Sequence, residues 1–115
     1  MTTTTIAARL IELCTVGKFL EAQEELYDTD IVSIETDGTR TLGAANMHIK
    51  EEQFLARIEK MGDIRYSDIL AAGSYFSVVL QMEIELKGVG PISIREVCVY
   101  QVKEGKIVFE QFFRD

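Results

Sequence analysis

The main hydrophobic period of the chain changes near Gly62, and this change limits the folds open to it. Before Gly62, apolar residues recur at three- and four-residue spacing, as from Ile6 to Leu10. Beyond Gly62 they occupy every second position, as from Val78 to Leu86. The first spacing places side chains on one face of a helix, and the second places them on one face of a strand. The sequence therefore predicts an α+β fold, with most of its helices before most of its strands.

Glycines and capping residues divide the two halves into elements. Gly17 can end a first helix, Asn46 can cap a third helix, and Gly62 can end that third helix. The expected elements are helices at 6–16, 19–27 and 46–61, and strands at 30–35, 64–72, 78–87, 92–102 and 107–113. Because short turns join the last strands, we expect them to form one antiparallel sheet.

Length and charge exclude several classes of partner. A chain of 115 residues has the usual size of one domain, so we expect a single domain over residues 1–115. The net charge of -7 disfavours nucleic acids and anionic membranes, which bind clustered Lys and Arg. Neither a membrane-spanning apolar run nor a secretory leader is visible, so we expect a cytoplasmic protein.

Cysteine and motif content predict neither a metal nor a cofactor. Cys14, Cys98 and the single histidine His48 leave a four-ligand zinc site one ligand short. In a reducing compartment, two buried free thiols are the expected state of these cysteines. Gly88 and Gly90 fall in a hairpin rather than before a helix, so they do not form a dinucleotide loop.

Three stretches carry a resemblance to a known family. They are Glu12-Leu13-Cys14 with Gly17-Lys18-Phe19, Glu25-Leu26-Tyr27 before Asp30-Ile31-Val32-Ser33-Ile34-Glu35, and Gly105-Lys106-Ile107-Val108 with Phe112-Phe113. In these residues and in its element order, the chain resembles the SnoaL-like family of the nuclear transport factor 2-like superfamily, which has a cystatin-like cone fold. The resemblance implies a cone-shaped, curved antiparallel sheet packed against three N-terminal helices. Since the superfamily contains isomerases, cyclases and inert assembly modules, it implies no single function.

Glu35 is the candidate catalytic residue that the resemblance implies. In members that resemble ketosteroid isomerases, a carboxylate at the end of the first strand moves a proton next to a substrate carbonyl. Glu35 falls at that place, counted from Leu26 and Tyr27, although the family residue is commonly Asp. The alternative is that Glu35 is a solvated carboxylate at a strand end.

The resemblance also argues against the ketosteroid isomerase reaction itself. That reaction needs hydrogen-bond donors for the developing oxyanion, which the family takes from a helix-one tyrosine and a carboxylic acid on a late strand. Leu10 stands at the tyrosine position, and Val97 or Cys98 at the acid position. We therefore expect other chemistry, or binding without catalysis.

Further candidates interrupt apolar faces or supply aromatic rings. Glu96 breaks the apolar face of the strand at 92–102, and Asp68 lies between Tyr66 and Leu70; a carboxylate on a core face is costly unless it is paired or lines a pocket. The candidate ligand-binding residues are Tyr27, Asp68, Glu96, Cys98, Tyr100 and Phe113. The alternative for these residues is a structural role in the core or at the surface.

The outer face of the sheet is more apolar than a solvated face. We expect it to carry Val79, Val97, Val99, Val108 and Phe112. Because relatives of this kind commonly pair through that face, we expect a homodimer. The predicted function is binding of a small apolar or carbonyl-containing molecule in the cone, with proton transfer by Glu35; the alternative is a non-catalytic dimerisation or assembly module with a filled cone.

Overall fold

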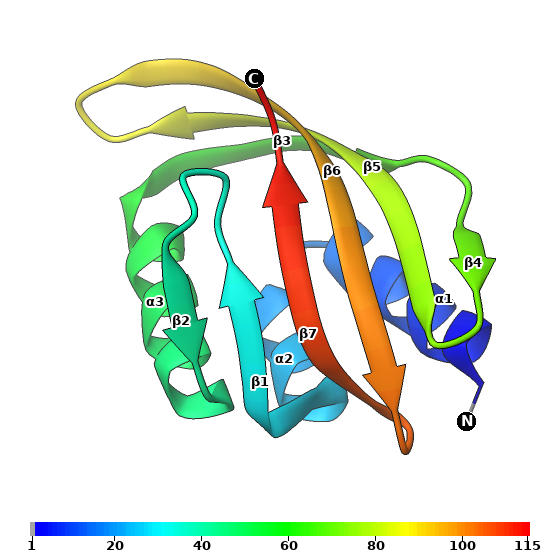
Figure 1. The fold of residues 1–115 in the computed structure, drawn as a ribbon. Helices are drawn as coiled ribbons and strands as arrows, with labels where there is room; N and C mark the ends of the chain where they lie inside the picture. Colours follow the sequence, from blue (N-terminus) through cyan, green and yellow to red (C-terminus); the bar gives the residue numbers. More distant parts are fainter. Residues whose placement is uncertain (1) are drawn as a thin grey trace.

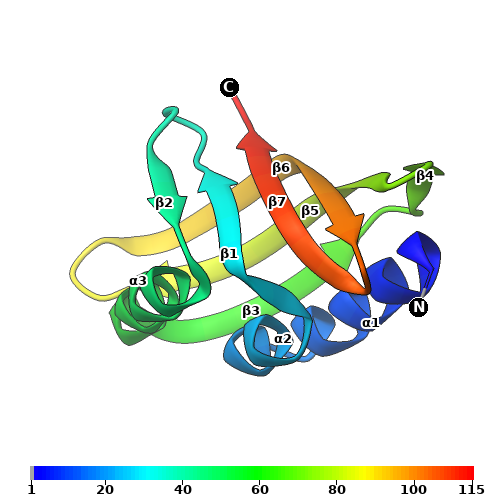
Figure 2. The ribbon, with the colours of Figure 1, turned by 60° about the horizontal axis from the view of Figure 1, so that its bottom comes forward.

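Three helices cover the concave side of a curved sheet (Figures 1 and 2). The structure is a computed structural model that describes residues 2–115. Its helices are α1 (Thr3–Thr15), α2 (Phe19–Leu26) and α3 (Ala44–Arg57). Its strands are β1 (Tyr27–Ile34), β2 (Arg40–Leu42), β3 (Ile58–Tyr66), β4 (Leu70–Ala72), β5 (Tyr75–Leu86), β6 (Gly90–Lys103) and β7 (Lys106–Phe113). This is the α+β cone that the resemblance implies.

The sheet is mixed rather than purely antiparallel. Its strand order is β2-β1-β7-β6-β5-β3, with β4 paired to β5 beside this path. β1 and β7 run parallel, whereas the other pairs are antiparallel. The expectation of an antiparallel sheet is corrected at this one pair. A parallel pair needs a crossover connection, and here the chain between β1 and β7 runs through α3 and five strands.

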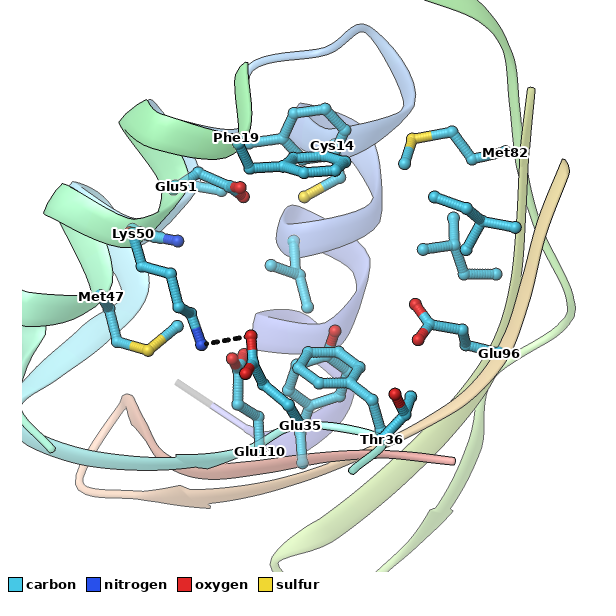
Figure 3. A pocket seen from close by; sticks show the side chains of 18 of the residues that line it. Cys14, Phe19, Glu35, Thr36, Met47, Lys50, Glu51, Met82, Glu96 and Glu110 are labelled. Carbon is cyan, nitrogen blue, oxygen red and sulfur yellow. Dashed lines mark ion pairs between the residues drawn. The ribbon is translucent and has the colours of Figure 1, made fainter. Parts of the chain in front are cut away.

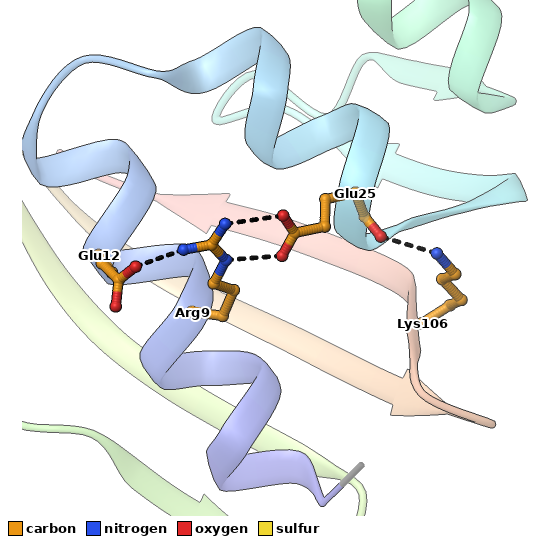
Figure 4. Close-up of polar contacts among 4 residues, drawn as sticks. All are labelled: Arg9, Glu12, Glu25 and Lys106. Carbon is orange, nitrogen blue, oxygen red and sulfur yellow. Dashed lines mark hydrogen bonds and ion pairs between the residues drawn. The ribbon is translucent and has the colours of Figure 1, made fainter.

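A polar network on the surface joins the first two helices to the sheet (Figure 4). The Arg9 guanidinium of α1 donates to both carboxylate oxygens of Glu25 on α2, at 2.6 and 2.8 Å, and it also contacts Glu12. Lys106 at the start of β7 donates to the backbone oxygen of Glu25 at 2.7 Å. Glu25 therefore fixes the end of α2, directly before β1, against both α1 and the sheet.

α3 ends four residues earlier than the sequence predicts. Ile58 and Met61 continue the helical spacing of α3, but in the structure they belong to β3 and pair with Leu86 and Ile84 of β5. Gly62, expected to end the helix, lies inside β3. A Cβ atom there would stand 2.7 Å from the backbone oxygen of Glu83. Tertiary pairing with β5 thus overrides a local pattern that fits either structure.

A bulge in β7 decides which of its side chains face the helices. Val102 pairs with Ile107 and Gln101 pairs with Phe109, so Val108 is an extra residue on β7. An extra residue exchanges the two faces of the strand beyond it. As a result, Glu110 turns inward and is almost fully buried, whereas strict alternation from Ile107 would place it outside.

The core lies where the helix stripes meet the inner faces of β5 and β6. Phe76 stacks on Tyr100 with ring centroids 4.7 Å apart, and Phe112 meets Tyr100 edge-on. Cys14 and Cys98 are both buried and free, as the sequence predicts. Within residues 2–115, no helix is long and apolar enough to cross a membrane.

Candidate functional site

A cavity of about 580 Å³ lies between the helices and the concave face of the sheet (Figure 3). This volume falls in the range of small-molecule sites in proteins. Its mouth includes the exposed side chains of Thr36, Asp37 and Arg114. Its apolar lining is Leu10, Cys14, Phe19, Ala22, Met47, Phe54, Leu80, Met82, Ile94 and Phe112. Its remaining polar lining is Gln23, Tyr27, Glu35, Lys50, Glu51, Tyr66, Glu96, Tyr100 and Glu110.

An ion pair between β1 and α3 stands on the cavity wall. Glu35 follows β1 on the face that carries Ile31 and Ser33, because alternate residues of a strand share a face. Lys50 Nζ lies 3.1 Å from Glu35 Oε1 and donates to Thr41 Oγ1, also at 3.1 Å. An ammonium group has three N–H donors, so one remains for a ligand.

A buried carboxyl group lies on the sheet side of the same wall. Ser33 Oγ donates to Glu110 Oε2 at 2.6 Å, and the Tyr27 hydroxyl donates to Glu110 Oε1. Burial raises the pKa of Glu110, although these two donors and the charge of Lys50 act in the opposite direction. The network fixes the Glu110 carboxyl in place and keeps the Tyr27 ring at the edge of the cavity.

Glu51 is a carboxylic acid of the cavity wall that titrates near neutral pH. Figure 3 shows it reaching from α3 toward Phe19 and Cys14, away from the pair of Glu35 and Lys50. Burial and, to a smaller extent, the charge of Glu110 raise the pKa of Glu51 to about 7 against the opposing charge of Lys50. A group with this pKa can both donate and accept a proton under physiological conditions.

Glu96 occupies the sheet side opposite α3. Burial raises its pKa, the nearby Arg114 lowers it and the charge of Glu35 raises it. The buried thiol of Cys14, which also lines the cavity, has a pKa raised to about 12 by burial, so it is not a nucleophile. The chemistry of the cavity therefore belongs to its carboxyl groups and to Lys50.

Gln23 of α2 is the polar group that the protein leaves unsatisfied. Its side chain is only 8% exposed and lines the cavity. Among the buried side chains of residues 2–115, its Oε1 atom is the one without a hydrogen-bond partner. Buried acceptors are normally paired, so this oxygen calls for a specific explanation.

Comparisons with known proteins agree with this architecture. The model of the SnoaL-like domain family matches residues 1–114. The chain belongs to the SnoaL-like domain family. No curated protein matches the chain.

Solved structures share the fold of this SnoaL-like domain at low sequence identity. A candidate SnoaL-like polyketide cyclase from Mesorhizobium loti is 24% identical, with a TM-score of 0.90 over 99% of this chain and 100% of that one. A protein with a cystatin-like fold from Xanthomonas campestris is 19% identical, with a TM-score of 0.84 over 98% and 90%. A protein with a ketosteroid isomerase-like fold from Catenulispora acidiphila, in complex with trimethylamine, is 16% identical, with a TM-score of 0.80 over 99% and 88%.

The structure of the SnoaL-like domain brings together only some of the candidate catalytic and ligand-binding residues that the sequence predicts. Glu35, Tyr27, Glu96 and Tyr100 line the cavity. The other three lie elsewhere: Cys98 is fully buried behind the lining, Asp68 is exposed between β3 and β4, and Phe113 is on the outer face. Phe112, expected outside, takes the inward position because of the β7 bulge.

Sequence reasoning missed Lys50, Glu51, Glu110 and Gln23. For Glu51 and Gln23 the sequence does contain a usable pattern. Glu51 stands four residues after Met47 and three before Phe54, so it interrupts an apolar stripe. Gln23 sits likewise between Ala22 and Leu26 on the buried side of α2. No sequence pattern reveals that Glu110 faces the cavity, because the face on which its side chain lies depends on the bulge at Val108.

Proposed function

We propose that this SnoaL-like domain binds a small, largely apolar carbonyl compound in its cavity, and that Glu35 accepts a proton from the carbon next to the carbonyl. The observation that carries the proposal is the position of the Glu35 carboxylate. It lies on the wall of a cavity of about 580 Å³ that has both apolar and polar side chains in its lining, with Lys50 at 3.1 Å. A positioned base in such a place is what proton abstraction requires.

Lys50 supplies the second group that this reaction needs. As the C–H bond breaks, the proton passes to Glu35 and the electron pair moves to the carbonyl oxygen, which gives an enolate. The free N–H of Lys50 can donate to that oxygen, and such a donor typically contributes about 3 kcal/mol. Lys50 thereby replaces donors that neither Leu10 nor Cys98 can provide. Return of the proton to another carbon would complete an isomerisation.

The alternative function, a non-catalytic assembly module, requires a filled cone. The cavity volume and its ring of carboxyl groups favour a ligand instead. The Catenulispora protein, which shares this fold, was solved in complex with trimethylamine, and this supports the proposal that the fold serves small molecules.

Proton exchange tests the proposal directly. Ketones such as cyclohexanone and acetophenone are incubated with the protein in deuterium oxide, and NMR follows loss of the hydrogen next to the carbonyl. We expect Glu35→Gln to slow this exchange about 100-fold or more, because the base is lost. Asp68→Asn, which removes an exposed carboxylate away from the cavity, should leave the rate unchanged. Equal rates for Glu35→Gln and the wild type would exclude Glu35 as the base.

A further inference from the structure

Glu51 is a half-buried carboxylic acid of the cavity wall that the proposed proton abstraction does not use. It lies on the apolar stripe of α3, four residues after Met47 and three before Phe54, and all three side chains line the cavity. Figure 3 shows its carboxyl group reaching from α3 toward Phe19. Placing a carboxyl group on an apolar face costs free energy, so its presence there calls for a functional explanation.

Glu51 and Lys50 serve different parts of the cavity. They are consecutive residues of α3, and consecutive residues of a helix do not face each other. Lys50 reaches Glu35, at 3.1 Å, whereas Glu51 turns toward the part of the wall that Phe19 and Cys14 form. A molecule that fills the cavity therefore meets acid–base groups at two separate places.

The carboxyl group of Glu51 is free to exchange its proton with a ligand. Both oxygens of Glu110 accept hydrogen bonds from protein hydroxyl groups, which hold that carboxyl group in place. Within residues 2–115, no hydrogen bond or ion pair holds the Glu51 carboxyl. Glu96 lies across the cavity from α3, where the charge of Arg114 opposes its protonation. Among these buried acids, Glu51 is thus the one best placed to donate a proton.

The surroundings of Glu51 keep part of its population protonated at neutral pH. Burial raises its pKa to about 7, with a smaller contribution from the charge of Glu110 and against the opposing charge of Lys50. Burial also raises the pKa of the other titratable side chains around it, so they stay protonated. They are Cys14 on α1, Tyr27 on β1 and Tyr66 on β3. An acid such as Glu51 can give a proton to a substrate and regain one from water.

We propose that Glu51 is a second catalytic residue of this cavity, which donates a proton to the γ carbon of a β,γ-unsaturated ketone after Glu35 has removed one from the α carbon. This inference rests on the proposed function, because it needs the enolate that Glu35 generates. The electron pair of the broken C–H bond passes through the conjugated dienolate to the γ carbon. There it forms a C–H bond with the proton of Glu51, the double bond moves into conjugation with the carbonyl, and Glu51 is left as the carboxylate. Proton exchange with water restores both residues.

Two separate groups give an isotope pattern that a single base does not. A single base that carries the proton from one carbon to the other also carries an isotope with it. With two groups, the abstracted hydrogen is lost to water through Glu35, and the γ carbon gains its hydrogen from Glu51. The probe is cyclohex-3-en-1-one with two deuterium atoms at C2, incubated with the protein in ordinary water. We expect the product, cyclohex-2-en-1-one, to carry no deuterium at C4 by NMR; transfer of deuterium from C2 to C4 would overturn the inference.

A variant of Glu51 tests the residue itself. Glu51→Gln keeps the size of the side chain but removes the acidic proton. We expect it to slow formation of the conjugated product, followed by ultraviolet absorbance, about 100-fold, and to slow exchange at C2 much less. Glu52→Gln makes the same change at the next, exposed position of α3 and should form product at the wild-type rate. Product formation by Glu51→Gln at the wild-type rate would refute the inference.

The outcomes separate this inference from the proposed function. If the wild type exchanges no hydrogen at C2 in deuterium oxide, both the proposed function and the role of Glu51 fail. If it exchanges hydrogen at C2 but forms no conjugated product, the role of Glu51 alone fails. Loss of both exchange and product in Glu35→Gln, together with loss of product alone in Glu51→Gln, supports both.

Discussion

Burial is the main influence on the charge of three carboxyl groups of the cavity. Glu51, Glu96 and Glu110 all have a raised pKa, and burial is the largest cause for each. On the surface the hydrogen bond outweighs burial, because the Arg9 guanidinium lowers the pKa of Glu25. The pKa shifts differ in direction because the environments differ. A buried carboxyl group loses hydration that its few polar neighbours do not fully replace. Burial thus favours the protonated form of these three acids, and Glu51, with a pKa of about 7, can exchange a proton near neutral pH.

Glu51 should make the free energy of unfolding depend on pH. Its pKa is about 7 in the folded protein and near the ordinary 4.5 when unfolded, so the folded state binds more protons between these values. Stability from this group is present below pH 4.5 and is lost as pH rises through 7. Over that window the change amounts to about 3 kcal/mol. Glu51→Gln, which cannot ionise, should therefore be more stable than the wild type at pH 8.

Urea unfolding at pH 5 and pH 8 measures this effect. The advantage of Glu51→Gln should be large at pH 8 and small at pH 5. Glu24→Gln, at an exposed position of α2, should differ little from the wild type at either pH. A constant difference between Glu51→Gln and the wild type across this range would show that Glu51 does not titrate there.

At the scale of elements, the sequence predicts what depends on local period and misses what depends on pairing. Glu35 could be placed because the family resemblance implies a carboxylate at the end of the first strand, and the alternation of Ile31 and Ser33 puts that end toward the helices. Phe112 and Phe113 exchange faces, since the bulge at Val108 arises only when β7 pairs with β6. The end of α3 is wrong for a related reason: Ile58 and Met61 fit helix and strand alike, and contact with β5 decides between them.

The pairing of β3 with β5 can be tested at Gly62. A Cβ atom would stand 2.7 Å from the Glu83 backbone oxygen and 3.2 Å from its Cβ. Since backbone cannot move aside cheaply, we expect Gly62→Ala to lower the free energy of unfolding by about 1–3 kcal/mol. Lys60→Ala, on an exposed position of the same strand, controls for strand propensity and should cost less. Equal midpoints of thermal unfolding for the two variants would contradict the close approach of β3 to β5.

At the scale of the whole molecule, the two faces of the sheet have separate roles. The inner face meets the helices and bounds the cavity. The outer face exposes a row of neighbouring apolar side chains, because Val79 pairs with Val97 and Val97 pairs with Phe113. Val97 is 43% exposed and Phe113 is 48% exposed. The bulge that turns Phe112 toward the cavity thus also places Phe113 in this row.

We propose that two copies of the chain pair through this row. Apolar side chains that lie together on a sheet face gain free energy when a second copy covers them, and a two-fold axis lets one patch serve both partners. Light scattering at micromolar concentration should give the mass of a dimer, and Val97→Glu should give that of a monomer because it buries a charge at the centre of the contact. Val89→Glu, which adds the same charge at the exposed tip of the β5–β6 hairpin, should remain dimeric. A mass of one chain for the wild type would exclude this pairing and leave the cavity as the property of a monomer.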